Sequence, residues 1–326
     1  MMTNNAYVGI SRDLWLVGSG PMAVDYAKVL KTLEVPFSVI GRSVESAQVF
    51  ERETRISVFT GGLDACLENC SCTPRAAIVA VSVEELAKAT FALLVRGVRK
   101  ILVEKPGGLY AQEMKAVANA AKDYGAKVYV AYNRRFYASV IKAKEIILDD
   151  GGVTSYYFDF TEWSHVIEGL KKPQVVKENW FLANSSHVVD MAFYLGGIPK
   201  EINYQTSASL AWHPSAAVFT GSGVAANGAL FSYHANWQAP GRWGVEILTP
   251  RHRLIFRPLE QLHLQKIGSV EIVKQEIDDY LDVAYKPGLY RQVSAFLQQN
   301  CHEMLSIEDQ VSLVEKYYLK MANYRG

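Results

Sequence analysis

A chain of 326 residues is longer than one hydrophobic core normally supports, so two domains are expected. Lys and Arg (34) nearly balance Asp and Glu (33), and 49% of the residues are hydrophobic. This balance offers no broad positive surface to nucleic acid or to an anionic membrane. No segment approaches the ~18 apolar residues of a membrane span, and the N-terminus lacks a signal-peptide core, so a cytoplasmic location is expected.

The cysteines form one group and one outlier, because Cys66, Cys70 and Cys72 lie close together and Cys301 is far away. The group has no second ligand pair and no histidine at the spacing of a zinc site. We therefore expect reduced thiols and no metal site.

A glycine motif follows the first apolar run of the chain. Residues 13–17 precede Gly18-Ser19-Gly20-Pro21-Met22-Ala23, and a helical pattern continues to about Leu33. The spacing Gly-x-Gly-x-x-Ala is the alanine-ending dinucleotide fingerprint, in which the first glycine allows a tight turn and the second lets the backbone approach a pyrophosphate. The helix N-terminus adds unpaired N–H groups for the phosphates. We expect Gly18, Ser19, Gly20, Pro21 and Met22 to contact a dinucleotide.

The residues after the second expected strand bear on the choice between NAD and NADP. That strand covers residues 35–40 and leads into Gly41-Arg42-Ser43, where an NAD enzyme commonly carries an acidic residue for the ribose hydroxyls. A guanidinium and a hydroxyl instead suit a 2′-phosphate, so Arg42 and Ser43 favour NADP over NAD. The alternative is an exposed loop arginine that contacts nothing.

A later strand ends abruptly at a charged pair. Residues 101–103 are continuously apolar, and Pro106 with two glycines must end the strand at Lys105. In a parallel sheet this places Lys105 at the carboxyl ends of the strands, where such sheets bind ligands. The alternative is a solvated Glu104-Lys105 pair in a loop.

The two halves of the chain differ in the order of their predicted strands and helices. In residues 1–132, strands alternate with helices of roughly 10 to 15 residues, which predicts a Rossmann-like, doubly wound parallel α/β sheet. Residues 133–326 predict an α+β domain with a largely antiparallel open sheet. Its expected strands are residues 153–162, 201–210, 216–220, 225–237, 243–248, 253–256 and 262–267. Its expected helices are one that follows residue 136 and ends at about Leu148, and residues 186–195, 289–299 and 307–323.

Three motifs occur in a recognisable order: the glycine motif at residues 18–23, Glu104-Lys105-Pro106, and His187-Val188-Val189-Asp190. With the segment 133–136, they make the chain resemble the Gfo/Idh/MocA oxidoreductases, named for glucose-fructose oxidoreductase and inositol dehydrogenase. The resemblance implies hydride transfer between a nicotinamide and a hydroxyl or keto carbon of a sugar, nucleotide sugar or cyclitol. It also implies further cofactor contacts from Ser82, Glu104 and Asn133, and a cis Lys105-Pro106 bond.

The resemblance assigns catalytic roles to three residues. Lys105 would polarise the reacting oxygen, His187 would be the general acid or base, and Asp190 would hold His187 or a substrate hydroxyl. Elementary chemistry agrees, because histidine titrates near neutral pH and a lysine stabilises alkoxide character. His187 and Asp190 are three residues apart and share a helix face. Without the resemblance, such a pair is more often a local surface or capping interaction.

Two departures from the family pattern leave the substrate class open. Ala183 stands where many relatives carry an acid four residues before the histidine, and residues 81–86 replace the usual Thr-Pro-Asn-x-x-His. Ser185 and Ser186 could cap the helix or face the substrate, and we expect capping by at least one of them.

Tryptophans near polar residues are common in sugar sites, because their faces stack on C–H groups. We expect substrate contacts from Arg134, Trp163, Trp180 and Ser186, although core or interface packing is the alternative for each tryptophan. An open sheet usually needs its outer face covered, so we expect a homodimer or homotetramer through the second domain.

Two other functions share the cofactor fold. A non-catalytic NAD(P)-binding regulator would need only the nucleotide site, so the presence of Lys105, His187 and Asp190 favours an enzyme. An NAD-dependent glycosidase would hold NAD tightly, whereas Arg42 favours a dissociable NADP.

Overall fold

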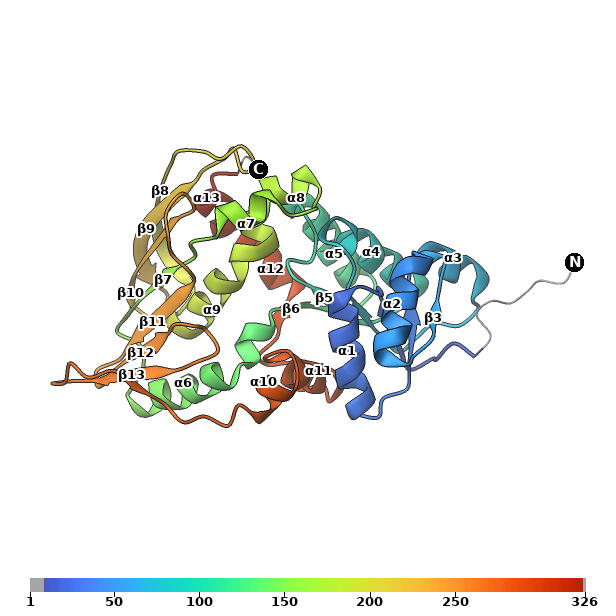
Figure 1. Cartoon of the computed structure of the whole chain (residues 1–326), viewed down its shortest axis with the longest axis horizontal. Coiled ribbons are helices and arrows are strands. Elements are labelled where there is room, and N and C mark those ends of the chain that lie inside the picture. Colours follow the sequence, from blue (N-terminus) through green and yellow to red (C-terminus); the bar gives the residue numbers. More distant parts are fainter. Residues whose placement is uncertain (1–8, 325–326) are drawn as a thin grey trace, which may run out of the picture. The chain divides into compact units, whose positions relative to one another are not determined.

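The computed structural model describes residues 9–324, which form two compact units (Figure 1). The first unit contains the residues up to Tyr132 together with Leu289–Ser312, and the second contains Asn133–Gly288 with the residues from Leu313 on. The expected boundary placed all of 133–326 in the second domain. In the structure, residues 289–312 belong to the first unit instead. In residues 9–324, no helix is long and apolar enough to cross a membrane.

The first unit is built on a seven-stranded sheet with the order β15-β6-β5-β4-β1-β2-β3. Strands β1 to β6 are parallel, and β15 pairs antiparallel with β6. This arrangement confirms the doubly wound sheet, since apolar runs such as Leu14–Val17 are buried along their whole length. The strands are β1 (Leu14–Val17), β2 (Phe37–Ile40), β3 (Val58–Phe59), β4 (Ala76–Val79), β5 (Lys100–Glu104), β6 (Lys127–Ala131) and β15 (Leu305–Ser306).

Helices cover both faces of this sheet. The sheet order runs from β1 to β3 in one direction and from β4 to β6 in the other, so right-handed crossovers place α1 and α2 on one face and α4 and α5 on the opposite face (Figure 1). The helices are α1 (Pro21–Thr32), α2 (Val44–Thr54), α3 (Gly62–Asn69), the 3₁₀ turn η1 (Val83–Glu85), α4 (Leu86–Arg96), α5 (Ala111–Asp123), α11 (Leu289–Leu297) and α12 (Ile307–Leu313).

The returning segment completes the first unit. Helix α11 packs against α1 and buries Leu289, Val293 and Phe296. The Lys100 ammonium donates to the backbone carbonyl of Phe296, and Gln310 Nε2 donates to Pro106 O at 3.0 Å. These contacts join positions about 200 residues apart, which local sequence patterns do not report.

The second unit is built on an eight-stranded sheet with the order β14-β13-β12-β11-β7-β10-β9-β8. All neighbouring strands are antiparallel except β7 and β10. The expected α+β fold with a largely antiparallel sheet is therefore confirmed. The strands are β7 (Ser155–Asp159), β8 (Pro199–Ser207), β9 (Val218–Ala225), β10 (Leu230–Asn236), β11 (Gly244–Leu248), β12 (His252–Phe256), β13 (His263–Lys266) and β14 (Val273–Lys274).

Strand β9 runs through a position where two separate strands were expected. The expected break fell at Gly221 and Gly223, yet both glycines lie within the strand. A Cβ at Gly221 would be 2.5 Å from Cε1 of Tyr233, and one at Gly223 would be 2.8 Å from Cζ of Phe231. The nearest atoms are carbonyl oxygens of β8, so the glycines make room for the backbone of β8 and the aromatic rings of β10 rather than for a turn.

The remaining helices of the second unit include those that carry the candidate site. Helix α9 packs on β7 and β11, with Phe193 edge-on to Phe158 at a centroid distance of 5.8 Å. This aromatic packing fixes the helix on the sheet. The helices are η2 (Asn133–Phe136), α6 (Ala138–Asp149), α7 (Ser164–Glu168), α8 (Gln174–Glu178), the π-helix η3 (Phe181–Ser185), α9 (Ser186–Gly196), α10 (Tyr280–Ala284), the π-helix η4 (Val314–Tyr318) and α13 (Leu319–Met321).

Candidate active site

The glycine loop after β1 has the shape of a phosphate cradle. Gly18 has a φ of +122°, and a Cβ there would be 2.2 Å from Ala80 O, so only glycine fits. Gly20, the N-cap of α1, has an ordinary φ of −83°, and a Cβ there would meet no atom within 4 Å. Internal packing therefore does not require Gly20, whereas close approach of a pyrophosphate to the helix N-terminus would. This loop fits the expected dinucleotide.

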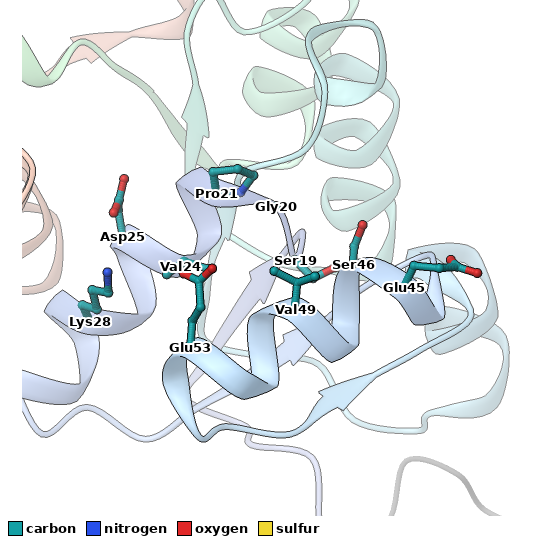
Figure 2. Close-up of a pocket in the computed structure, with 10 residues that line it drawn as sticks. All are labelled: Ser19, Gly20, Pro21, Val24, Asp25, Lys28, Glu45, Ser46, Val49 and Glu53. Carbon is teal, nitrogen blue, oxygen red and sulfur yellow. The ribbon is translucent and has the colours of Figure 1, made fainter. Parts of the chain in front are cut away.

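A pocket of about 360 Å³ opens between α1 and α2 (Figure 2). Ser19, Gly20 and Pro21 border one end of it. The rest is lined by three acidic side chains and one lysine, together with apolar and hydroxyl groups. Carboxylates repel phosphates, so the glycine end is the part suited to a nucleotide. The other lining residues are Val24, Asp25, Lys28, Glu45, Ser46, Val49 and Glu53.

Arg42 and Ser43 follow β2, beside the glycine loop. The Arg42 side chain is 78% exposed, and its Nη1 lies 3.4 Å from Glu85 Oε1. Ser43 Oγ accepts a hydrogen bond of 3.2 Å from Ser46 N and so caps α2, which leaves its O–H able to donate. An exposed ion pair of this kind is weak, so a phosphate could displace Glu85 from Arg42.

Lys105 comes directly after β5, at the carboxyl end of the strand, where the sequence predicted it. The Lys105-Pro106 bond is cis, as the resemblance implied. Glu104 Oε1 accepts a 2.7 Å hydrogen bond from Tyr26 OH of α1, and burial, followed by the charge of Glu104, raises the pKa of Tyr26. Ser82 follows β4 and is exposed. The expected contacts of the first unit thus all lie at the carboxyl ends of four adjacent strands, β2, β1, β4 and β5.

Asn133 and His187 both belong to the second unit. Asn133 is 7% exposed, and its Nδ2 donates to Pro287 O at 2.9 Å, so its amide holds the segment before α11. A cofactor contact by Asn133 stays a prediction. His187 lies in the first turn of α9 and is 8% exposed.

Asp190 has a partner that the sequence did not predict. Its two carboxylate oxygens accept hydrogen bonds from Arg135 of η2, at 2.9 Å from Nε and 2.6 Å from Nη2. Burial alone would lower the pKa of Arg135, but the Asp190 carboxylate outweighs it and raises that pKa. This bidentate, buried ion pair ties α9 to η2.

Glu162, just beyond β7, is a buried carboxylate that sequence reasoning missed. Its Oε1 accepts hydrogen bonds from Asn184 Nδ2 at 2.9 Å and Ser185 Oγ at 2.7 Å, and Arg242 Nη1 lies 3.3 Å from its Oε2. Burial raises the pKa of Glu162, and these partners oppose the rise. The sequence feature that could have indicated Glu162 is its position, at the end of a predicted strand with alternating polarity and directly before Trp163.

The two serines before His187 do not cap α9. No side chain forms a cap hydrogen bond at its N-terminus. Ser186 is fully buried, and its Oγ donates to Leu182 O at 2.7 Å, while Ser185 donates to Glu162. The capping expectation was wrong, because the π-helix η3 continues directly into α9 and leaves no open N-terminus there.

The tryptophans divide between core and surface. Trp212 stacks on Trp237 with a centroid distance of 5.5 Å, and both are buried, so these two belong to the core. Trp180 is 6% exposed and meets Trp212 edge-on. Trp163 is 49% exposed, with its Nε1 donating to Gly241 O at 2.9 Å. Trp163 is therefore the most accessible of the four.

A family model described as the oxidoreductase family with an NAD-binding Rossmann fold matches residues 14–132. No curated protein matches the sequence. Levoglucosan dehydrogenase in complex with NADH and levoglucosan is 19% identical, with a TM-score of 0.74 over 95% of this chain and 96% of that chain.

Two further solved structures are similar over nearly their whole length. UDP-N-acetylglucosamine 3-dehydrogenase GnnA from Acidithiobacillus ferrooxidans is 15% identical, with a TM-score of 0.69 over 93% of this chain and 94% of that chain. An oxidoreductase from Agrobacterium radiobacter in complex with NAD+, L-tartaric acid and magnesium is 16% identical, with a TM-score of 0.72 over 96% and 97%. At these identities the likenesses show the fold of both units.

Proposed function

We propose that the chain is an NAD(P)-dependent dehydrogenase or reductase of a hydroxyl or keto carbon and a member of the Gfo/Idh/MocA oxidoreductases, whose family model matches residues 14–132. The observation that carries the proposal is the position of Lys105 at the same strand ends as the glycine loop. Solved structures of similar fold act on or bind levoglucosan and a UDP-linked sugar. These ligands support a sugar or nucleotide sugar as the substrate, and the motif resemblance adds a cyclitol as an alternative.

The residues divide the chemistry between them. A nicotinamide bound on the first unit supplies hydride exchange at the reacting carbon. Lys105 binds the oxygen on that carbon and stabilises its negative charge. His187 takes the hydroxyl proton in oxidation and returns it in reduction. Asp190 acts on this site by holding Arg135 and α9, so its role is to position His187.

Lys105→Met should lower kcat by about 10²–10³-fold, because it removes the positive charge at the reacting oxygen. Nucleotide affinity should be unchanged. The measurement is turnover of sugars, cyclitols and keto sugars by nicotinamide absorbance, with nucleotide binding followed by fluorescence. Lys127→Met, an exposed lysine at the start of β6, is the matched control. Normal turnover by Lys105→Met would exclude the proposed role.

The same screen separates the enzyme from the other functions. Failure to bind either nucleotide would exclude the dehydrogenase, the NAD(P)-binding regulator and the NAD-dependent glycosidase alike. Binding without turnover would favour the regulator, and cleavage of a glycoside without net nucleotide reduction would favour the glycosidase.

We propose NADP as the preferred cofactor, on the basis of Arg42 and the absence of an acid after β2. Arg42→Ala should weaken NADPH binding about tenfold or more and leave NADH binding nearly unchanged, because only NADPH carries the 2′-phosphate. Glu85→Gln should tighten NADPH, since it removes the carboxylate 3.4 Å from Arg42. Fluorescence titration of both nucleotides measures these changes. Equal effects on NADH and NADPH would make Arg42 an ordinary loop residue.

We propose a homodimer or homotetramer through the outer face of the second sheet. Residues Ser232 and His234 of β10 face outward and are exposed, and Leu230 on the same face is 60% exposed. Tyr157 donates to Glu246 at the centre of this face, and Glu246 is only 8% exposed. Sedimentation showing only a 36.3 kDa monomer would contradict the proposal.

A further inference from the structure

Arg134 of η2 is a half-buried cation that forms no ion pair with a carboxylate among residues 9–324. Its Nε is buried, and among residues 9–324 the guanidinium has no hydrogen bond and no ion pair. Its contacts are aromatic, with Cζ 5.9 Å from the ring centroid of Tyr137 and 4.9 Å from that of Trp243. A guanidinium has five N–H donors, so this arrangement leaves donors available to a ligand.

A second guanidinium contacts the same tryptophan. Arg242 Cζ lies 4.3 Å from the ring centroid of Trp243 and 4.9 Å from that of Trp163. Burial lowers the pKa of Arg134, and the charge of Arg242 lowers it further. Arginine nevertheless stays protonated in proteins, so two positive charges share this position. We call Arg134, Glu162, Trp163, Arg242 and Trp243 the arginine–tryptophan cluster.

The acidic groups nearby do not neutralise both arginines. Glu162 pairs with Arg242 and accepts its other hydrogen bonds from Asn184 and Ser185. Glu260 is exposed and raises the pKa of Arg134 through its charge, but no ion pair joins the two residues among residues 9–324. Arg134 is therefore influenced by both carboxylates but forms no ion pair with either of them among residues 9–324.

The same cluster holds another donor without an acceptor. Trp243 is 7% exposed, and its Nε1 is buried and has no hydrogen-bond partner among the described residues. An indole N–H can only donate. Buried polar groups are nearly always hydrogen-bonded, so Arg134 Nε and Trp243 Nε1 are two unsatisfied donors within one cluster.

The position of the cluster within the second unit connects it with His187. Glu162 and Trp163 follow the end of β7, and Arg242 and Trp243 precede β11, its antiparallel neighbour. Glu162 also binds Ser185, two residues before His187. A ligand in the cluster would therefore be next to the segment that carries the proposed general acid or base.

We propose that the Arg134 guanidinium, with Arg242, binds an anionic group of the substrate, a carboxylate or a phosphate. The substrate is then a sugar acid or a phosphate-bearing sugar rather than a neutral sugar. That the bound anion belongs to a substrate rests on the proposed oxidoreductase function. The anion site itself rests on the contacts of the arginine–tryptophan cluster. Trp163, half exposed beside Arg242, supplies a face for the sugar ring.

Matched substrate pairs test this proposal: glucose against glucuronate, gluconate and glucose 6-phosphate, and inositol against its monophosphate. Each is assayed for nicotinamide reduction with wild type, Arg134→Met and Arg134→Lys. We expect the acidic members to have the higher kcat/KM. Arg134→Met should lower it by about 10- to 100-fold for those members, mainly through KM, and by a smaller factor for the neutral members. The carboxylates and phosphates in the panel identify which anion is bound.

Controls keep this result separate from the wider function. Arg134→Lys preserves the charge and should keep most of the acidic preference, and Lys274→Gln removes an exposed charge in the same unit without effect. Turnover of neutral sugars by wild type with no preference for the acidic members would overturn the anion site and keep the oxidoreductase. If nothing is turned over, thermal shift decides the inference. A stabilisation by acidic probes that Arg134→Met abolishes supports the anion site, and no stabilisation of wild type overturns it.

Discussion

Replacing His187 with alanine is expected to lower kcat by about 10²–10⁴-fold, because the proton of the reacting hydroxyl would lose its acceptor. His187 lies in the first turn of α9, which Phe193 and the Asp190–Arg135 ion pair hold against the rest of the second unit. Truncation to alanine should therefore leave the helix in place. The measurement is steady-state turnover together with nucleotide binding, and binding should be unchanged.

Two further readouts distinguish proton transfer from a packing effect. The limb of the pH–rate profile near neutrality, where an imidazole ordinarily titrates, should disappear in His187→Ala, and added imidazole should restore part of the activity. His302→Ala, an exposed histidine of the first unit, is the matched control. An unchanged pH profile with lowered kcat would mean that His187 supports the site without exchanging the proton.

Much of the first unit could be predicted because local sequence determines it. A parallel strand buried on both faces reads as an apolar run, and each run of β1, β4 and β5 was placed correctly. Gly18 is required by the approach of Ala80 O, and Lys105 is placed by the strand end before Pro106. The strands and the position of Lys105 depend on neighbours along the chain, and the glycine motif is recognisable from its spacing although the contact of Gly18 is with the distant Ala80.

The parts that escaped prediction depend on contacts between distant residues. The return of residues 289–312 depends on α11 packing against α1, and the continuity of β9 depends on rings of β10 that cross Gly221 and Gly223. Asp190 was predicted to hold His187 or a substrate hydroxyl because it shares a helix face with His187. Its carboxylate instead pairs with Arg135, 55 residues earlier. Spacing along a helix indicates which face a residue occupies but not which element packs there.

The π-helix before α9 explains why the serines were misread. A π-helix adds residues to a turn, so side chains after it face directions that a 3.6-residue period does not predict. Here Ser185 faces Glu162 and Ser186 bonds to Leu182 O within the helix. Glu162 thus places a carboxylate next to the helix start although position 183 is alanine. Many relatives carry an acid at position 183, whereas in this chain a carboxylate reaches the helix start from the segment after β7.

Asp190→Ala is expected to lower the free energy of unfolding by about 3–5 kcal/mol, because it leaves the Arg135 guanidinium buried without its carboxylate. The Asp190 side chain is fully buried and accepts two hydrogen bonds from Arg135, so no solvent can replace it. Urea unfolding followed by circular dichroism measures the loss, and Asp149→Ala, an exposed aspartate at the end of α6, is the control.

The double variant Arg135→Met/Asp190→Leu shows whether the pair stabilises the fold or prepares the site. Replacing both charges with apolar groups should recover most of the stability lost in Asp190→Ala, since neither charge is then stranded. If the pair also positions His187, the double variant should fold normally and still show lowered kcat with KM unchanged. Full activity in the double variant would confine Asp190 to stability. If Asp190→Ala is as stable as the wild type but has a strongly reduced kcat, Asp190 must instead contact the substrate or His187 directly.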